Sequence, residues 1–403
     1  MPEPPGPQPG WRPAWAEVDL DAVGHNVAVL RERCAPAALC AVVKADGYGH
    51  GAVPVARAVL EAGATWLAVA LVEEGLALRE AGLTAPILLL SEPPPPAMEA
   101  AVAARLTLTL YTATGVAAAV EAVGPSRPPV GVHLKVDTGM HRVGADPEDA
   151  AALARAVTEA RGLRLEGLWT HLAVADEPDQ GSVTAGQLAR FEEVRDALAA
   201  NGITPSLLHA ANSAGALGHP SARYDLVRCG IAVYGYPPGA ALAGAVDLRP
   251  ALCLRSRVTL VRRLAAGERL SYGRRYAIPE PGSVVATVPL GYADGVPRRL
   301  SAAGGEVLVG GRRRPIAGTV TMDQLMVDCG PGTAVQVGDE VVLLGRQGDD
   351  EITADEWAAR LGTISYEILC GIGPRVRRLV KGGSAASAER GGDVIQEALA
   401  LGE

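Results

Sequence analysis

Short apolar segments alternate with longer amphipathic segments from about residue 41 to residue 235. The apolar segments lie between turn residues, which is typical of buried β-strands, and the amphipathic segments, rich in Ala, Leu, Glu and Arg, predict helices. The predicted strands are Ala41–Lys44, Trp66–Leu71, Ile87–Leu90, Thr107–Leu110, Gly131–Val136, Leu165–Thr170, Ser206–His209 and Asp225–Cys229, and the predicted helices include Val53–Ala62, Glu73–Ala81, Glu148–Ala160 and Thr184–Ala200.

Eight strands in strict alternation with helices predict an α/β fold, a (β/α)8 barrel of the TIM type. The strands are apolar almost throughout, as expected for a parallel sheet that is buried on both faces. An open, doubly wound sheet stays possible, because periodicity does not show whether a sheet closes.

The pattern changes after about Gly239, where helical segments become scarce. Val, Thr and Leu then alternate between Gly/Pro turns, which predicts a mainly antiparallel β domain. Its predicted strands are Arg255–Val261, Val284–Pro289, Glu306–Val309, Leu325–Asp328 and Glu340–Leu344, with one helix at Ala354–Leu361. We expect the barrel to span residues 14–240 and the β domain residues 241–380. Residues 1–13 are expected to be disordered or to form a strand of the β domain, and residues 381–403 to form a flexible tail.

Composition limits the binding partners and the cellular compartment expected for the protein. The 403 residues carry 37 basic and 45 acidic side chains, a formal charge of −8, which argues against a nucleic-acid partner. The proline-rich N-terminus has no apolar core of signal-peptide length, and no apolar run approaches the roughly 20 residues that span a membrane. The six cysteines are scattered without a C-x-x-C pair. We therefore expect a cytoplasmic protein with reduced thiols and no membrane partner.

A glycine-rich turn follows the first predicted strand. Lys44 closes that strand, and Gly47, Gly49 and Gly51 follow at alternate positions. Burial at a strand end disfavours the charged form of a lysine, so Lys44 is a candidate Schiff-base nucleophile. The glycines allow the backbone to approach an anion such as a cofactor phosphate.

Two other interpretations of this run stay open. A lysine that ends a strand can simply point into water. The glycines also suggest a dinucleotide-binding loop, but they give G-x-G-x-G rather than G-x-G-x-x-G, and no acidic strand end follows to hold a ribose. The dinucleotide interpretation is therefore the weaker of the two.

Polar side chains gather at the carboxyl ends of the predicted barrel strands. Active sites of TIM-type barrels lie at this end, and the loops after strands seven and eight often bind phosphate. This convergence favours a functional site, although an aldolase-type lysine without a cofactor is also compatible with it. The residues concerned are Lys44, Lys135, Asp137, His171, Asn212, Ser213 and Arg228, with Ser213 and the Gly230-Ile231 backbone expected near a phosphate.

Eight short motifs occur in a fixed order along the chain. They are Ala41–Ala52, Lys135–Arg142, His209–Ser213, Val227–Gly235, Ser271–Gly273, Gly291–Gly295, Met322–Gln324 and Ser365–Glu367. Together they resemble the motifs of alanine racemases, which use pyridoxal phosphate, and Ala41–Ala52 resembles the cofactor-lysine motif of that family. The resemblance extends from Ala14 to Arg377. It departs at His141, where a small residue or asparagine is more usual.

The resemblance implies a two-base mechanism. Lys44 would hold the cofactor and serve the D face of the substrate, and Tyr272 of the partner subunit would serve the L face. His171 would hydrogen-bond that tyrosine, and Arg228 would face the pyridine nitrogen of the cofactor. The implied substrate is alanine, the implied assembly is a homodimer with shared active sites, and the implied role is supply of D-alanine for peptidoglycan. No metal is implied.

The resemblance also implies which residues bind the cofactor and the substrate. Lys135 matches a lysine that is carbamylated in many members of the family and orients an arginine. The implied substrate residues are Arg142, Met322, Tyr292 and Asp323, and the implied cofactor residues are Lys44, Tyr48, Trp66, Leu90, His171, Asn212, Ser213, Arg228, Gly230, Ile231 and Tyr366.

Two other functions compete with racemisation. A decarboxylase can have the same barrel and β domain, and a non-catalytic pyridoxal-phosphate carrier can have the barrel alone. The Ser271-Tyr272-Gly273 and Met322-Asp323-Gln324 motifs favour a racemase over a decarboxylase. The β domain with its tyrosines argues against a carrier.

Overall fold

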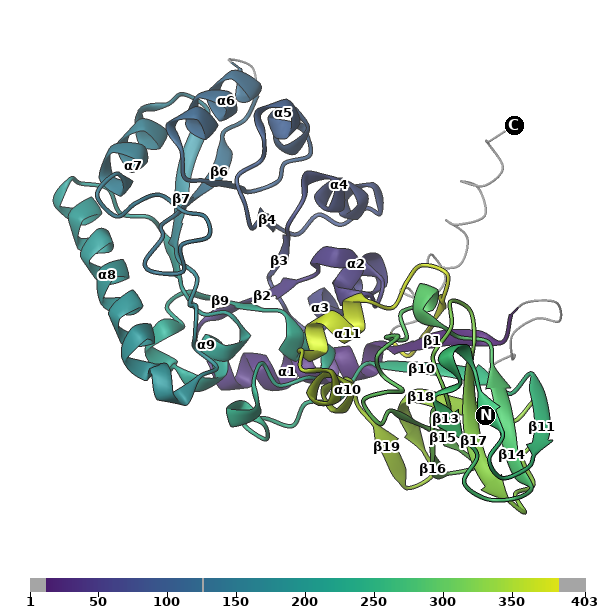
Figure 1. Cartoon of the computed structure of the whole chain (residues 1–403). Coiled ribbons are helices and arrows are strands. Elements are labelled where there is room, and N and C mark those ends of the chain that lie inside the picture. Colours follow the sequence, from purple (N-terminus) through teal and green to yellow (C-terminus); the bar gives the residue numbers. More distant parts are fainter. Residues whose placement is uncertain (1–11, 125–126, 384–403) are drawn as a thin grey trace, which may run out of the picture. The chain divides into compact units, whose positions relative to one another are not determined.

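The computed structural model describes residues 12–124 and 127–383. They form two compact units, one made of Leu20–Arg249 and the other of the N-terminal segment up to Asp19 together with Pro250–Gly382 (Figure 1). Within the described ranges, no helix is both long and apolar enough to cross a membrane.

Parallel strands form a closed barrel in the Leu20–Arg249 unit. They pair in the orders β4-β3-β2-β9 and β5-β6-β7-β8. A parallel bridge between Leu88 and Thr107 joins the two sheets on one side, and the Asp225 N–H donates to the Leu208 carbonyl on the other at 3.0 Å. The strands are β2 (Ala38–Val42), β3 (Trp66–Val69), β4 (Ile87–Leu89), β5 (Leu108–Leu110), β6 (Val130–Lys135), β7 (Leu163–Trp169), β8 (Leu207–His209) and β9 (Leu226–Cys229). This closure confirms the predicted barrel and excludes the open sheet.

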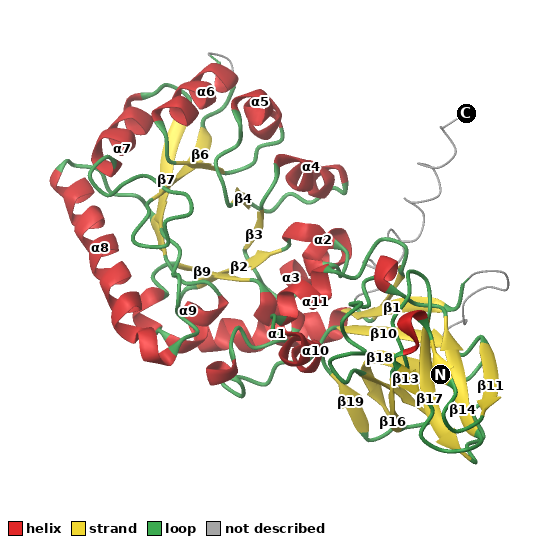
Figure 2. Ribbon diagram, viewed as in Figure 1, coloured by secondary structure: helices red, strands yellow, loops and turns green. Residues whose placement is uncertain are grey.

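Helices lie outside the ring of strands (Figure 2). Helix α7 shows why, because its buried residues Ala150, Leu153, Ala154 and Val157 recur at helical spacing on one face. The helices of this unit are α1 (Leu20–Cys34), α2 (Lys44–Tyr48), α3 (Ala52–Glu61), α4 (Val72–Glu80), α5 (Pro95–Ala103), α6 (Ala113–Val123), α7 (Ala150–Glu159), α8 (Gly181–Ala200) and α9 (Ser213–Gly218), with 3-10 turns η1 (Pro178–Gln180), η2 (Pro220–Ala222), η3 (Ile231–Tyr234) and η4 (Ala240–Leu242).

The second unit is built from mainly antiparallel sheets, as the sequence predicts. The largest has the order β16-β15-β18-β10-β1-β20, with β19 paired to β18, and the others are β11-β14-β17 and β12-β13. The strands are β1 (Ala14–Asp19), β10 (Leu252–Arg257), β11 (Leu260–Leu264), β12 (Arg269–Leu270), β13 (Tyr276–Ala277), β14 (Ser283–Val288), β15 (Glu306–Val309), β16 (Arg312–Pro315), β17 (Leu325–Pro331), β18 (Glu340–Gln347), β19 (Asp350–Ile352) and β20 (Arg377–Lys381); the helices are η5 (Tyr272–Arg274), η6 (Tyr292–Asp294), α10 (Ala354–Leu361) and α11 (Ser365–Cys370).

Several boundaries differ from those expected. The barrel unit ends at Arg249 rather than at residue 240. Strand β1 pairs with β10 and β20, so residues 14–19 belong to the β unit and not to the barrel. The predicted strand Arg255–Val261 is two strands, because the chain leaves β10 after Arg257 and begins β11 at Leu260. The expectations for most of residues 1–13 and of the tail 381–403 concern positions 1–11 and 384–403, which lie outside the described residues.

Candidate active site

Lys44 lies in a left-handed turn directly after β2. Strand β2 ends at Val42, two residues earlier than predicted, and α2 begins at Lys44. Ala45, Asp46 and Tyr48 have positive φ angles of 52°, 51° and 52°. Each such angle costs an L-residue roughly 1–2 kcal/mol relative to right-handed backbone. Contacts from outside the turn must therefore hold this backbone in place.

Three groups converge beside this turn. The Gly230 N–H donates to the Ser213 hydroxyl at 2.9 Å. A Cβ atom added to Gly230 would overlap the Tyr48 hydroxyl, so the missing side chain lets that hydroxyl pack directly against the Gly230 backbone. Ile231 begins the next turn, η3. Hydroxyl groups gathered beside backbone N–H groups in this way suit a phosphate group.

Asn212 shapes the loop that follows β8. Its side-chain oxygen accepts from the Gly215 N–H at 2.9 Å and caps α9. Its amide nitrogen donates to the Leu172 carbonyl at 3.3 Å. Asn212 thus connects the loop after β8 to the loop after β7.

Arg228 is buried in the barrel, where only 2% of its surface is exposed. Its guanidinium donates to the carbonyls of Thr170 and Ala210 at 2.8 and 3.0 Å and to Nδ1 of His209 at 2.8 Å. Burial lowers the pKa of Arg228 to about 10, so it stays charged at neutral pH. These bonds fix the direction of a permanent positive charge.

Two buried histidines, His209 and His133, extend the hydrogen-bond network of Arg228. Because arginine has no acceptor, Nδ1 of His209 must accept and its Nε2 carries the proton. That Nε2 lies 2.9 Å from Nδ1 of His133. Burial and the charge of Arg228 lower the pKa of His133 to about 3 and that of His209 well below its ordinary value. Both histidines are therefore neutral supports of the arginine.

Lys135 ends β6 and is almost completely buried, with 3% of its surface exposed. Its Nζ lies 4.3 Å from the ring centroid of Trp169. Burial, then the positive charges of Arg228 and Arg142, lower its pKa to about 7, and Asp137 opposes this change. A large fraction of this amine is neutral at physiological pH.

Asp137 organises the loop that presents Arg142. Its Oδ1 accepts from the N–H groups of Gly139, Met140 and His141 at 2.9, 3.0 and 3.0 Å. His141 has a φ of 55°, which explains why a small residue or asparagine suits this position better. Arg142 follows it and is exposed.

His171 follows β7 and is held from two sides. Its Nδ1 lies 3.4 Å from Nη2 of Arg228. Buried Gln187 donates to the His171 carbonyl at 3.0 Å and accepts from the Ala173 N–H at 2.8 Å. Burial, then Arg228 and Lys135, lower the pKa of His171 well below its ordinary value. Gln187 was not predicted as a site residue, because its partners are backbone groups of another loop.

Two residues of the expected cofactor set lie at opposite ends of their strands. Leu90 follows β4, where its N–H donates to the Val69 carbonyl at 2.8 Å. Trp66 instead begins β3, with its ring centroid 5.3 Å from that of His133. The structure therefore does not place Trp66 among the residues at the carboxyl ends of the strands, because Trp66 is the first residue of β3.

The remaining expected residues lie in the β unit. Tyr272, Met322 and Tyr292 are 73%, 52% and 41% exposed, unusual values for large apolar side chains. Asp323 pairs with Arg375 at 2.7 Å. Tyr366 lies in α11.

Hydrogen bonds connect the loops that carry Tyr272 and Tyr292 to the segment that contains Thr319 and Thr321. The Thr319 hydroxyl donates to the Tyr272 carbonyl at 2.9 Å, and the Tyr292 N–H donates to the Thr321 carbonyl at 3.0 Å. Tyr272 also lines a hollow of about 410 Å³ with Thr321 and Met326. The expected site residues thus form two groups, one in each unit.

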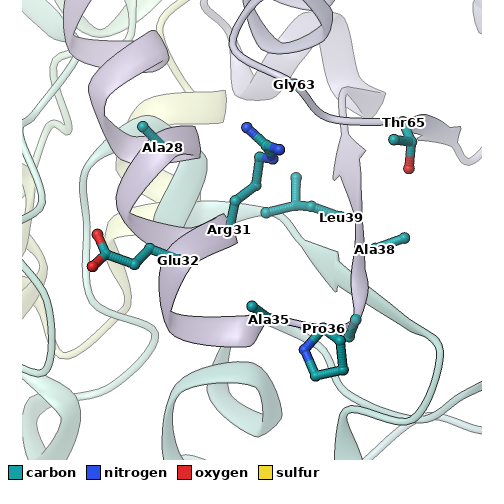
Figure 3. A pocket seen from close by; sticks show the side chains of 10 residues that line it. Ala28, Arg31, Glu32, Ala35, Pro36, Ala38, Leu39, Gly63 and Thr65 are labelled. Carbon is teal, nitrogen blue, oxygen red and sulfur yellow. The ribbon is translucent and has the colours of Figure 1, made fainter.

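A second hollow, of about 450 Å³, lies at the amino end of β2 (Figure 3). Ala28, Arg31 and Leu39 line it, and Arg31 donates to the Ala62 carbonyl at 3.1 Å. None of the expected site residues lines this hollow. Among the residues that the structure describes, no group of three or more His, Cys, Asp or Glu side chains is placed to hold a metal ion.

Comparisons with known proteins cover almost the whole chain. Residues 18–238 match the alanine racemase N-terminal domain and residues 251–380 its C-terminal domain. An alanine racemase of Symbiobacterium thermophilum is 50% identical over 380 residues, 93% of this chain and 99% of the relative.

Solved structures of racemases are also similar to this chain. The alanine racemase of Streptomyces lavendulae aligns with a TM-score of 0.87 and 40% identity over 94% of this chain and 99% of that one. A histidine racemase of Leuconostoc mesenteroides aligns with a TM-score of 0.85 and 31% identity over 94% of this chain and 100% of that one. The chain belongs to the alanine racemase family.

Proposed function

We propose that the protein interconverts L-alanine and D-alanine with pyridoxal phosphate and supplies D-alanine for peptidoglycan synthesis in the cytoplasm. The observation that carries this proposal is the grouping of Lys44, Arg228 and the Ser213–Gly230 contact at the carboxyl ends of the barrel strands. A lysine, a fixed cation and a set of phosphate donors are the parts that this cofactor needs.

Pyridoxal phosphate fits the residues present. Lys44 would hold it covalently, and the Tyr48 and Ser213 hydroxyl groups, which gather at Gly230, would bind its phosphate, with Ile231 and Tyr366 completing the donors. The bound cofactor supplies an electron sink that makes the α-hydrogen of an amino acid acidic. Leu90 and Asn212 would shape the surrounding loops, whereas the position of Trp66 does not support a contact.

Arg228 would face the pyridine nitrogen. A guanidinium has donors and no acceptor, and its bonds to His209 and two carbonyls direct it. It would leave the ring nitrogen unprotonated, which weakens the electron sink. The expected benefit is fewer side reactions such as transamination.

The proposed mechanism uses two bases, one on each face of the substrate. Lys44 would take or return the proton on the D face, and the Tyr272 hydroxyl would do so on the L face. A tyrosine with an ordinary pKa near 10 costs about 4 kcal/mol to use as phenolate at pH 7. His171, which burial and neighbouring cations hold neutral, would hydrogen-bond the tyrosine.

The substrate carboxylate would be held by Arg142 and the Met322 backbone. Tyr292 and Asp323 would form a wall that excludes larger side chains. Lys135 would be carbamylated: its neutral amine adds to carbon dioxide, a C–N bond forms, and one proton is released. The resulting negative group would pair with Arg142, whose charge already acts on Lys135.

A homodimer with shared sites would bring the two bases together. Large exposed side chains at Tyr272, Tyr292 and Met322 support an interface there. Mixing inactive Lys44→Ala and Tyr272→Phe proteins should restore activity, because each mixed dimer has one site with both bases. If subunits exchange and activity does not return, each site is built from one chain.

Racemisation assays on both enantiomers of alanine, serine and histidine test the reaction and its substrate. Borohydride reduction and peptide mapping test the lysine. We expect conversion of alanine in both directions and a pyridoxyl adduct on Lys44. Loss of carbon dioxide from the substrate would indicate a decarboxylase, no turnover a carrier, and an adduct on Lys135 would contradict the assignment of Lys44.

A further inference from the structure

A glutamate from the next β/α unit holds the turn that carries Lys44. Glu74 lies in the first turn of α4, after β3. Its Oε2 accepts from the N–H groups of Ala70 and Leu71 at 2.8 and 3.1 Å, and its Oε1 accepts from the Ala45 N–H at 2.6 Å. One carboxylate therefore connects the loop after β3 to the residue that follows Lys44.

The Ala45 N–H is a point where the turn needs an outside partner. Within the turn, Gly47 donates to the Val43 carbonyl and Gly49 to the Ala45 carbonyl, both at 2.9 Å. The Ala45 N–H has the Glu74 carboxylate as its acceptor. Ala45 itself has φ 52° and ψ 50°, a conformation that L-residues other than glycine avoid. A charge-assisted bond from a helix is well suited to hold it there.

The other side of the turn has its own support. Asp46 accepts from the Ala52 N–H at 2.7 Å and so connects the turn to the start of α3. Asp46 belongs to the turn and moves with it. Glu74 belongs to another β/α unit and fixes the turn relative to the barrel.

We propose that Glu74 is a positioning residue, which holds Ala45 in its left-handed conformation and thereby fixes Lys44 relative to the cofactor. The inference rests on the proposed function of Lys44. A helix cap alone would use only Oε2, whereas the bond to Ala45 uses Oε1. Glutamine has a single carbonyl oxygen and cannot make both sets of bonds.

The test compares Glu74→Gln with two controls in the full-length protein. Glu73→Gln removes the same charge from an exposed neighbour on the same helix. Thr353→Ala removes the cap of α10, where the threonine hydroxyl accepts from the Glu356 N–H at 3.1 Å, and so reports a loss of stability without a change at the turn.

Three measurements separate positioning from stability. In Glu74→Gln, hydrogen exchange of the Ala45 amide should become at least about tenfold faster, and kcat should fall about 10- to 100-fold with KM nearly unchanged. The visible circular dichroism of the bound cofactor should decrease in amplitude per cofactor, because Lys44 is less fixed. Both controls should resemble the parent protein in these three measurements, although Thr353→Ala is less stable.

A second variant keeps the proposal testable if Glu74→Gln folds poorly. Glycine adopts the left-handed turn without the side-chain penalty, so adding Ala45→Gly to Glu74→Gln should recover at least about threefold in kcat, or folding itself. Unchanged exchange and dichroism in Glu74→Gln, or no recovery in the double variant, would reduce Glu74 to a helix cap. A borohydride adduct away from Lys44 would instead overturn the proposed function.

Discussion

The protonation state of Lys135 gives a prediction that can be worked through in numbers. Burial and the charges of Arg228 and Arg142 lower its pKa from 10.5 to about 7. At pH 7.5 such a lysine is ~75% neutral, whereas an ordinary lysine is ~0.1% neutral. Neutral amines react with carbon dioxide, so Lys135 should be carbamylated at neutral pH while exposed lysines are not.

The lowered pKa of Lys135 also reduces the free energy of unfolding when the lysine is unmodified. The unfolded lysine binds a proton up to pH 10.5, whereas the folded one releases it near pH 7, so stability rises with pH between these values. At pH 7.5 the free energy of unfolding is reduced by up to ~4 kcal/mol. Carbamylation should remove this penalty, so carbon dioxide should raise the urea midpoint.

The assay is carbon-13 NMR after equilibration with labelled bicarbonate at constant carbon dioxide pressure. A carbamate signal should grow as pH rises through about 7, and Lys135→Gln should abolish it. Lys381→Gln, at an exposed lysine, should leave the signal unchanged. A signal that appears only near pH 10, or that survives in Lys135→Gln, would refute the reasoning.

Two further predictions concern the barrel. Gly230→Ala should weaken cofactor binding at least about tenfold in a dialysis assay, because the added methyl group overlaps the Tyr48 hydroxyl. Gly181→Ala should bind the cofactor normally, because a Cβ at that position meets nothing within 4 Å. Equal affinities of the two variants would contradict the phosphate site. Below about pH 6.5 the unfolded His133 binds a proton that the folded residue takes up only near pH 3, so the free energy of unfolding should decrease by up to ~1.4 kcal/mol per pH unit. The urea midpoint of His133→Gln should therefore depend less on pH. An unchanged pH dependence of the midpoint would contradict a buried neutral histidine.

The barrel was predictable because its strands are buried on both faces, so each appears in the sequence as a separate apolar run. The end of the first barrel strand, β2, was harder to predict. Apolarity continues through Val43, but the backbone turns left-handed after it, and no residue pattern marks three non-glycine residues with positive φ. The sheet membership of β1 depends on β10 and β20, which are more than 230 residues away in sequence.

The candidate site was predicted from side chains that are unusual for their position in the fold. Lys44, Lys135, His171 and Arg228 stand out at strand ends because charged or titratable groups are rare in a buried barrel. Glu74 and Gln187 did not stand out, because they act on backbone N–H and carbonyl groups of neighbouring loops. Contacts of this kind depend on the fold and leave no spacing in the sequence.

The central claim is that two different bases serve the two faces of alanine. Deuterium exchange at the α-carbon in Tyr272→Phe tests it most directly, with cofactor content measured in the same samples. Exchange from D-alanine through Lys44 should continue, exchange from L-alanine should be lost, and racemisation should fall in both directions. Equal loss of exchange from both enantiomers with cofactor still bound would contradict the claim, since it would mean that one base serves both faces.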